Sequence, residues 1–170
     1  RRQRQMCIRD RSKAYSMTGW RIGYAAGNKE IIKKMKTLQS QSTSCASSVS
    51  QYAAISALTQ KCEELPKMNA EYKERHDYVV KELNNIPGVT CRETDGTFYV
   101  FPSFTKYIEE SQKINNDEEL AMYLLNEGKV AVVPGSAFGM SGHLRLSIAL
   151  DLKTLEIAMN RIKTTLNNDE

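Results

Sequence analysis

The sequence predicts an α/β protein in which helices alternate with at least four short strands. Its 170 residues are 41% hydrophobic, which is enough apolar material for a folded core and argues against wholesale disorder. Several segments carry apolar residues at the three- and four-residue spacing of an amphipathic helix. Shorter stretches alternate between apolar and polar residues and are bounded by turn-forming residues, as strands are. This mixture places the chain in the α/β or α+β class, of which we favour α/β.

Five helices are predicted from the apolar spacing and from signals at their ends. Asn28 can accept a hydrogen bond at the start of the first helix, which the hydroxyl-rich stretch 39–45 is expected to end. Pro87 and Gly88 end the third helix, and Gly128 ends the fourth. The predicted helices cover residues 29–38, 49–57, 66–86, 117–127 and 155–166.

Four strands are predicted between these helices. Asp95 and Gly96 are a turn signal between two alternating stretches, so the first two strands are expected to pair as a hairpin. Pro134 and Gly135 end the third strand, and the fourth precedes the last helix. The predicted strands cover residues 89–93, 97–101, 130–133 and 144–149.

The first eleven residues account for the positive charge of the chain. The whole sequence has 24 basic and 20 acidic residues, and residues 1–11 contain five of the arginines and one aspartate. This string resembles the translation of a transposon-end sequencing adapter, so we expect the natural protein to begin at about Ser12. Without residues 1–11, 19 basic and 19 acidic residues remain. A chain with no net charge lacks the clustered positive charge that nucleic-acid binding needs.

Membrane, secreted and metal-binding classes are all disfavoured. No apolar run approaches the ~20 residues that span a bilayer, and no signal peptide opens the sequence. Cys45, Cys62 and Cys91 have no paired spacing, so we expect reduced thiols in a cytoplasmic protein. His76 and His143 have no further ligand at metal-binding spacing and are expected to be structural.

The segment 12–24 is the richest in residues that bind anions. Lys13 lies eight residues before Arg21, which stands in a turn between Gly19 and Gly23. The glycines allow the backbone to approach a ligand, and the planar guanidinium of Arg21 suits phosphate oxygens. The alternative is that both cations are solvated and that the glycines mark an ordinary turn, and spacing alone favours this alternative.

Arg145 is a second candidate anion-binding residue. In an alternating strand, Leu144, Leu146 and Ile148 face one side while Arg145 and Ser147 face the other. An arginine inside an apolar strand is more often an edge residue whose charge reaches water. The strand pattern by itself leaves both interpretations open.

Four motifs carry a resemblance to a known enzyme family. They are SKAYSMTGWRIGY at 12–24, GTFY at 96–99, VAVVPGSAFG at 130–139 and HLRLSIA at 143–149. In this order they resemble class I aminotransferases, which are fold-type I enzymes that use pyridoxal 5'-phosphate (PLP). The similarity extends over nearly all of residues 12–168, and the chain is most similar to bacterial aspartate aminotransferases, especially at residues 39–43.

The resemblance implies roles for four residues. Lys13 would form the Schiff base with PLP and afterwards carry a proton as a positioned base. Arg21 and Ser12 would bind the cofactor phosphate, and Arg145 would hold the α-carboxylate of the substrate with two hydrogen bonds. The aromatic residues Phe98, Tyr99, Phe101 and Phe138 are expected in the core.

The resemblance also implies a domain organisation. Residues 12–60 would be the end of the large PLP-binding domain with an interdomain helix, and residues 61–170 would be the small C-terminal α/β domain. The family's contacts to the cofactor ring lie upstream of this segment. The fragment alone is therefore expected to be inactive.

The predicted function is that of a homodimeric, cytoplasmic aminotransferase. The intact protein would exchange the amino group of aspartate or an aromatic amino acid with a 2-oxo acid such as 2-oxoglutarate. Two alternatives stay open because fold does not determine reaction type. They are another PLP enzyme, a lyase or decarboxylase, and a non-catalytic PLP-binding module of a transcription regulator. Neither nucleic acid nor a membrane is expected as a partner.

Overall fold

The computed structural model describes residues 7–10 and 15–167. The chain divides into two compact units, Arg1–Leu65 and Pro66–Glu170. The first unit carries the segment that contains Arg21, and the second carries Arg145. Each unit is described by itself below.

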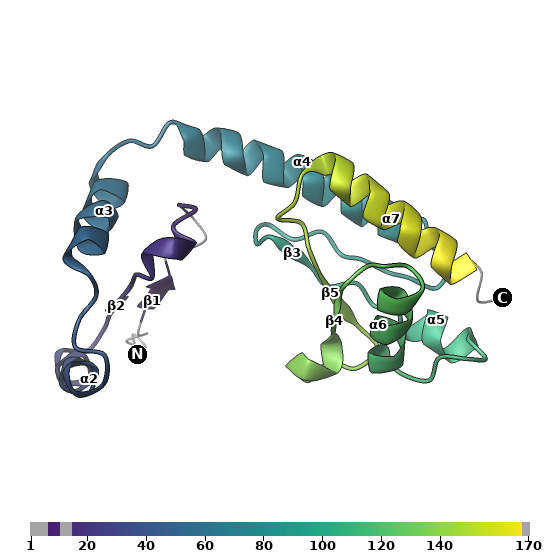
Figure 1. Cartoon of the computed structure of the whole chain (residues 1–170), viewed down its shortest axis with the longest axis horizontal. Helices are drawn as coiled ribbons and strands as arrows, with labels where there is room; N and C mark the ends of the chain where they lie inside the picture. The colour runs from purple at the N-terminus through teal and green to yellow at the C-terminus, as the bar shows by residue number, and fades with distance from the viewer. Residues whose placement is uncertain (1–6, 11–14, 168–170) are drawn as a thin grey trace, which may run out of the picture. The chain divides into compact units, whose positions relative to one another are not determined.

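The first unit contains a two-stranded sheet and two helices (Figure 1). Strand β1 (Cys7–Asp10) pairs antiparallel with β2 (Gly23–Ala26). This pairing uses main-chain N–H and C=O groups, so it depends little on which side chains β1 carries. A short 3-10 helix, η1 (Thr18–Trp20), lies between them in sequence. Helices α2 (Lys29–Ser42) and α3 (Ser48–Thr59) follow.

The two helices of the first unit are those that the sequence predicts, but both run further than predicted, α2 to Ser42 and α3 to Thr59. The side chain of Asn28 accepts the backbone N–H of Glu30 at 2.9 Å and caps α2, which ends within the hydroxyl-rich stretch 39–45. Most apolar side chains of these helices are exposed in this unit. They include Ile31, Leu38, Val49, Tyr52, Ile55 and Leu58.

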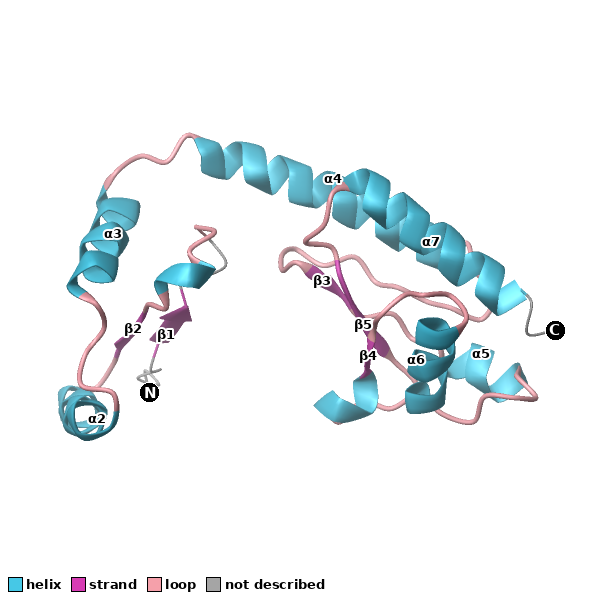
Figure 2. Ribbon diagram, viewed as in Figure 1, coloured by secondary structure: helices cyan, strands magenta, loops and turns pink. Residues whose placement is uncertain are grey.

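The second unit is built around a three-stranded antiparallel sheet in the order β3-β5-β4 (Figure 2). The central strand β5 (Leu144–Ser147) pairs with β3 (Tyr99–Val100) on one side and with β4 (Val133–Pro134) on the other. The helices are α4 (Glu64–Asn84), α5 (Thr105–Glu110), α6 (Asp117–Asn126) and α7 (Leu152–Asn167). Another short 3-10 helix, η2 (Gly135–Phe138), follows β4.

The hydrophobic core of the chain lies in the second unit. Helices α4 and α7 run side by side in Figure 1, and an ion pair between Lys163 and Glu82 joins them. Their apolar faces pack with β5 and α6 in one cluster of buried residues. Its most buried members are Val79, Leu83, Val100, Phe104, Leu120, Leu124, Leu144, Ile148, Met159 and Ile162.

The predicted hairpin at 89–101 is wrong. Residues 89–93 form no strand: Thr90 makes a single antiparallel bridge to Ser103, and the side chain of Asn84 holds both the N–H and the C=O of Cys91, at 2.8 and 2.9 Å. A side chain that satisfies the backbone in this way competes with a strand ladder. Of the second predicted strand, only Tyr99 and Val100 pair, and their partner is β5.

The third predicted strand is displaced toward the C-terminus. The N–H of Val130 donates to the carbonyl oxygen of Leu124 at 3.1 Å, which ties this residue to the end of α6 instead of a neighbouring strand. The strand consists of Val133 and Pro134. Pro134 is therefore part of the strand that it was predicted to end.

Two tyrosine side chains donate hydrogen bonds to backbone carbonyl oxygens at the C-terminal end of α7. Tyr107 donates its hydroxyl to the carbonyl oxygen of Leu166 at 3.2 Å, and Tyr123 donates to that of Thr165 at 3.3 Å. The last carbonyls of a helix have no partner within the helix. These two bonds therefore fix α5 and α6 against the C-terminal end of α7.

Candidate functional site

The turn at 15–24 holds Arg21 in an unusual backbone conformation. Arg21 directly follows η1 and has φ +49° and ψ +53°. Ser16, which precedes η1 in the sequence, also has a positive φ, +52°. The left-handed region costs a residue with a side chain about 1–2 kcal/mol. Such outliers concentrate at functional sites, where the surrounding structure holds them. The turn therefore keeps Arg21 in place at a cost in backbone energy.

The side chain of Arg21 has several N–H groups that make no hydrogen bond within residues 15–167. It is exposed, and one nitrogen, Nη1, donates to the carbonyl oxygen of Thr18 at 3.3 Å. No acidic side chain of residues 15–167 pairs with it. A guanidinium has five N–H donors, so most of them are available to an anion. This donor set fits a phosphate group.

Lys13 and Ser12 lie outside the described residues. The structure therefore gives no geometry for the predicted Schiff-base lysine or for the neighbouring hydroxyl. Arg21 and Arg145 belong to different units. The two arginines are the predicted site residues whose surroundings the structure shows.

Arg145 lies in the middle of β5, on the face opposite the core. Leu144 and Leu146 are buried on one face, and the side chain of Arg145 is half-buried on the other, as the alternation predicts. Its guanidinium carbon lies 4.5 Å from the ring centre of Tyr99 and 4.7 Å from that of Phe138. Both distances are within the range of a favourable cation–π interaction. Within residues 15–167, no carboxylate is paired with Arg145.

Phe138 is not a core residue, although the sequence predicts one. Its side chain is 51% exposed, and its ring lies at the edge of Phe101, with 6.2 Å between the centres. Phe101 in turn stacks on His143 at 5.3 Å. The ring of Phe138 is held by other rings and by the cation of Arg145, and it contributes little to the hydrophobic core.

Asp117 holds the loop that carries Phe138, and sequence reasoning missed this role. Its Oδ2 accepts the backbone N–H of Ser136 at 2.7 Å, and its Oδ1 accepts that of Gly142 at 3.3 Å. Burial alone would raise the pKa of Asp117, but these hydrogen bonds outweigh burial and lower it. In the sequence, Asp117 stands only as an acidic residue in the first turn of a predicted helix, a position that favours a negative charge. Its hydrogen-bond partners in the loop could be found only from the tertiary structure.

The loop itself is closed by short backbone contacts. Gly135 donates its N–H to the carbonyl oxygen of His143 at 2.7 Å and accepts the N–H of Met140 at 3.0 Å. A side chain at Gly135 would overlap the carbonyl oxygen of Met140. Gly142 has φ +72°, a conformation that suits glycine. These constraints leave the loop little freedom to move Phe138.

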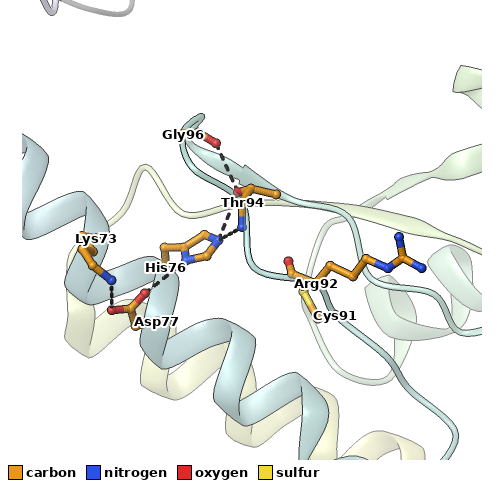
Figure 3. A network of polar contacts seen from close by, with 7 residues as sticks. All are labelled: Lys73, His76, Asp77, Cys91, Arg92, Thr94 and Gly96. Carbon is orange, nitrogen blue, oxygen red and sulfur yellow. Dashed lines mark hydrogen bonds and ion pairs between the residues drawn. The ribbon is translucent and has the colours of Figure 1, made fainter.

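His76 anchors the segment that leads into β3 (Figure 3). Its Nε2 accepts the backbone N–H of Thr94 at 3.3 Å and lies 3.1 Å from the Thr94 hydroxyl. The other ring nitrogen, Nδ1, lies 3.3 Å from Oδ1 of Asp77. His76 is buried. Its contact with Thr94 therefore helps to position the following segment, in which Tyr99 lies against Arg145.

The cysteines of the described chain and its possible metal ligands form no further candidate site. Cys45 and Cys62 are exposed free thiols, and Cys91 is a buried one. Burial raises the pKa of Cys91 to about 11. Within residues 7–10 and 15–167, no three His, Cys, Asp or Glu residues gather as metal ligands would. Over the same residues, each helix is too short or too polar to cross a bilayer.

Comparison with known proteins places this geometry in a family. The family model described as "Aminotransferase class I and II" matches residues 7–162. The match includes the turn with Arg21, the loop with Phe138 and the strand with Arg145.

Individual relatives agree with the family model. Aspartate aminotransferase of Rhizobium meliloti is 43% identical over 165 residues, which cover 95% of this chain and 40% of that protein. Aspartate/prephenate aminotransferase of Cereibacter sphaeroides is 47% identical over 156 residues, covering 89% of this chain and 39% of that protein. The chain thus spans about two fifths of the length of the curated relatives it matches.

Solved structures show the same similarity in three dimensions. The crystal structure of the Rhizobium meliloti aspartate aminotransferase has a TM-score of 0.89 and 42% identity, covering 95% of this chain and 42% of that one. An aromatic aminotransferase from Pyrococcus horikoshii has a TM-score of 0.87 and 34% identity, covering 96% of this chain and 43% of that one. The chain covers part of the fold of these enzymes. It belongs to the class I and II aminotransferase family.

Proposed function

We propose that the intact protein transfers an amino group between an amino acid and a 2-oxo acid with PLP as its cofactor. The proposed donors are aspartate or an aromatic amino acid, and the proposed acceptor is a 2-oxo acid such as 2-oxoglutarate. The observation that carries the proposal is the family match, because residues 7–162 include all four predicted site residues. The similar proteins described above are aspartate, aspartate/prephenate and aromatic aminotransferases, and they support this substrate class.

The proposed cofactor contacts come from the first unit. When bound, PLP supplies the electron sink that lets a proton leave the α-carbon of an amino acid. Arg21 would hold its phosphate, because a guanidinium with unused N–H donors suits a dianion. Ser12 would add a hydroxyl to the same phosphate. Lys13 would attach to the cofactor aldehyde and, once displaced by the amino acid, would carry the proton from the α-carbon to the C4′ carbon of the cofactor.

The proposed substrate contact comes from the second unit. Arg145 is half-buried, so its charge is less screened than that of a surface arginine. With no carboxylate of residues 15–167 paired to it, it would bind the α-carboxylate through two parallel hydrogen bonds. A carboxylate held at two points has a fixed orientation. The bond from the α-carbon to its proton would then point in one direction, as proton transfer requires.

The other assignments are extensions of the same proposal. We propose that residues 12–60 belong to a large PLP-binding domain and 61–170 to a small domain. We also propose a cytoplasmic homodimer, and the free thiols of Cys45, Cys62 and Cys91 in the described part of the chain are consistent with a reducing compartment. A lyase, a decarboxylase or a regulatory module is not favoured, because the similar proteins named above are aminotransferases.

The test is a transamination assay on the complete protein, which requires the upstream part of its gene. Aspartate and an aromatic amino acid are supplied in turn with 2-oxoglutarate, and glutamate formation is measured. Lys13→Ala is expected to abolish both turnover and the attachment of PLP to this peptide, detected by borohydride reduction and mass spectrometry. Lys36→Ala, at an exposed lysine of α2, is the matched control and should retain both.

Each alternative function predicts a different result in these experiments. Ammonia release without glutamate would indicate a lyase, and carbon dioxide release would indicate a decarboxylase. DNA binding without any turnover would indicate a regulatory module. Full turnover by the Lys13→Ala variant would overturn the assignment of the lysine.

A further inference from the structure

Arg145 is surrounded by aromatic rings on the face of the sheet that points away from the core. Its guanidinium carbon lies over the rings of Tyr99 and Phe138 at 4.5 and 4.7 Å. Tyr99 belongs to β3 and Phe138 to η2, so the two rings come from separate segments and converge on one cation. A guanidinium stacks through its flat faces. Its N–H donors lie in the plane and stay available for an acceptor.

Both rings are themselves held in place. Tyr99 pairs with Ser147 across the β3–β5 ladder, and its ring lies 4.2 Å from that of Phe98, centre to centre. Phe98 packs against the hydrophobic core. Phe138 is held by the loop that Asp117 fastens through the N–H groups of Ser136 and Gly142. The rings are thus fixed before any ligand is present.

A role in core packing does not account for Phe138. Its side chain is 51% exposed, and a half-buried ring contributes only part of the stabilisation that a fully buried ring would contribute. An exposed aromatic ring over a cation that pairs with no carboxylate in residues 15–167 has a more specific explanation. It restricts the directions that the long arginine side chain can take.

We propose that Tyr99 and Phe138 are positioning residues that hold the guanidinium of Arg145 in one orientation before a carboxylate binds. An arginine side chain has large rotamer entropy, which binding must otherwise remove. Restricting the side chain in the free protein lowers that cost and strengthens binding. The meaning of this arrangement for catalysis rests on the proposed carboxylate-binding role of Arg145. The arrangement itself is a property of the 170-residue chain.

The first experiment measures the orientation of Arg145 without any substrate. In the full 170-residue chain, the Nε–Hε resonance of Arg145 is recorded by NMR, because nearby ring faces shift it upfield. Phe138→Leu and Tyr99→Leu are each expected to move this resonance toward the position of free arginine and to increase its fast motion. Tyr99→Phe keeps the ring and should leave the resonance in place. Phe138→Leu alters a half-exposed side chain, so it tests the proposal even where Tyr99→Leu perturbs β3.

A second arginine in the same unit provides a matched control. Arg75 lies over the ring of Tyr72 at 5.4 Å. Tyr72→Leu should shift the resonance of Arg75 and leave that of Arg145 unchanged. An Arg145 resonance that stays in place in the folded Phe138→Leu and Tyr99→Leu variants would overturn the proposal.

The second experiment separates this proposal from the proposed function. In the complete enzyme, Phe138→Leu and Tyr99→Leu should each raise KM for the amino acid about two- to fivefold, with cofactor content unchanged and kcat less affected. Tyr99→Phe should restore KM. If Arg145→Ala raises KM while neither ring variant changes it, Arg145 binds substrate but the rings do not position it. If Arg145→Ala leaves KM unchanged, the carboxylate role is wrong, and the NMR result alone decides the orientation.

Discussion

The carboxylate of Asp117 accepts the backbone N–H of Ser136, nineteen residues further along the chain, at 2.7 Å. Its second oxygen accepts the N–H of Gly142 at 3.3 Å. Only 2% of Asp117 is exposed, so water has little access to replace these bonds. One buried side chain at the start of α6 therefore fixes both ends of the loop that brings Phe138 to Arg145.

Replacing Asp117 should destabilise the second unit. Asp117→Asn keeps the shape but leaves one oxygen acceptor, and it turns an amide NH2 toward a backbone N–H. Losing hydrogen bonds to a charged, buried group costs about 2–3 kcal/mol of unfolding free energy, measurable by urea denaturation. Asp151→Asn is the control, since Asp151 makes exposed hydrogen bonds to Thr154. Equal losses for the two variants would contradict the role of Asp117.

The contribution of Asp117 should disappear in acid. Its hydrogen bonds lower its pKa in the folded state, whereas the pKa of an unfolded aspartate is about 3.9. The stabilisation is therefore present above the unfolded pKa and is lost as the pH falls through the lower, folded value. Urea denaturation at about pH 6 and at about pH 3 should show the difference between the unchanged chain and Asp117→Asn shrinking in acid. A difference that is the same at both pH values would refute this.

Cys91 should be unreactive in the folded chain. Burial raises the pKa of its thiol to about 11, so almost none of it is thiolate at neutral pH, and its side chain is 5% exposed. A chain with Cys7→Ser, Cys45→Ser and Cys62→Ser retains only this thiol. Labelling by iodoacetamide at neutral pH should be slow until urea unfolds the protein. Fast labelling without denaturant would show that Cys91 is accessible.

Arg21→Gly should have opposite effects on stability and on cofactor binding. Glycine adopts φ +49° without strain, so the substitution should stabilise the apo form of the complete protein by about 0.5–1 kcal/mol. Loss of charge-assisted hydrogen bonds should weaken PLP binding about 10- to 100-fold. Thermal unfolding and a spectroscopic titration with PLP measure the two effects. Arg21→Lys keeps the charge and should bind with intermediate affinity, while undiminished binding by Arg21→Gly would exclude a phosphate contact.

Arg145→Ala should weaken amino-acid binding in the complete protein while the PLP content stays the same. Two hydrogen bonds between a guanidinium and a carboxylate correspond to an increase in KM of about 100-fold. Arg145→Lys keeps the charge without the planar pair of donors, so its KM should lie between the two. Steady-state kinetics with varied amino acid, alongside a cofactor assay, provides the measurement. An unchanged KM in Arg145→Ala would rule out the carboxylate contact.

Local signals in the sequence predicted the longer helices and the alternation of β5, but they did not predict the short helix α5 (Thr105–Glu110). Asn28 caps α2 as predicted, and the predicted fourth helix is α6, because capping and apolar spacing act between residues a few positions apart. Leu144 and Leu146 are buried and Arg145 faces the other side, since the two-residue period belongs to any strand. The motifs along the chain were also sufficient to indicate its family, which the match at residues 7–162 confirms.

Only the tertiary structure decided which distant groups meet. The segment before Tyr99 reads as a hairpin strand, but Asn84 satisfies its backbone from another element. Phe138 reads as a core residue from its hydrophobicity, but it lies half-exposed over Arg145. Hydrogen bonds and ring contacts between residues far apart in sequence leave no periodic pattern. For this reason the sequence determined the local elements and the family, while the fold alone determined how the surroundings of Arg145 are built.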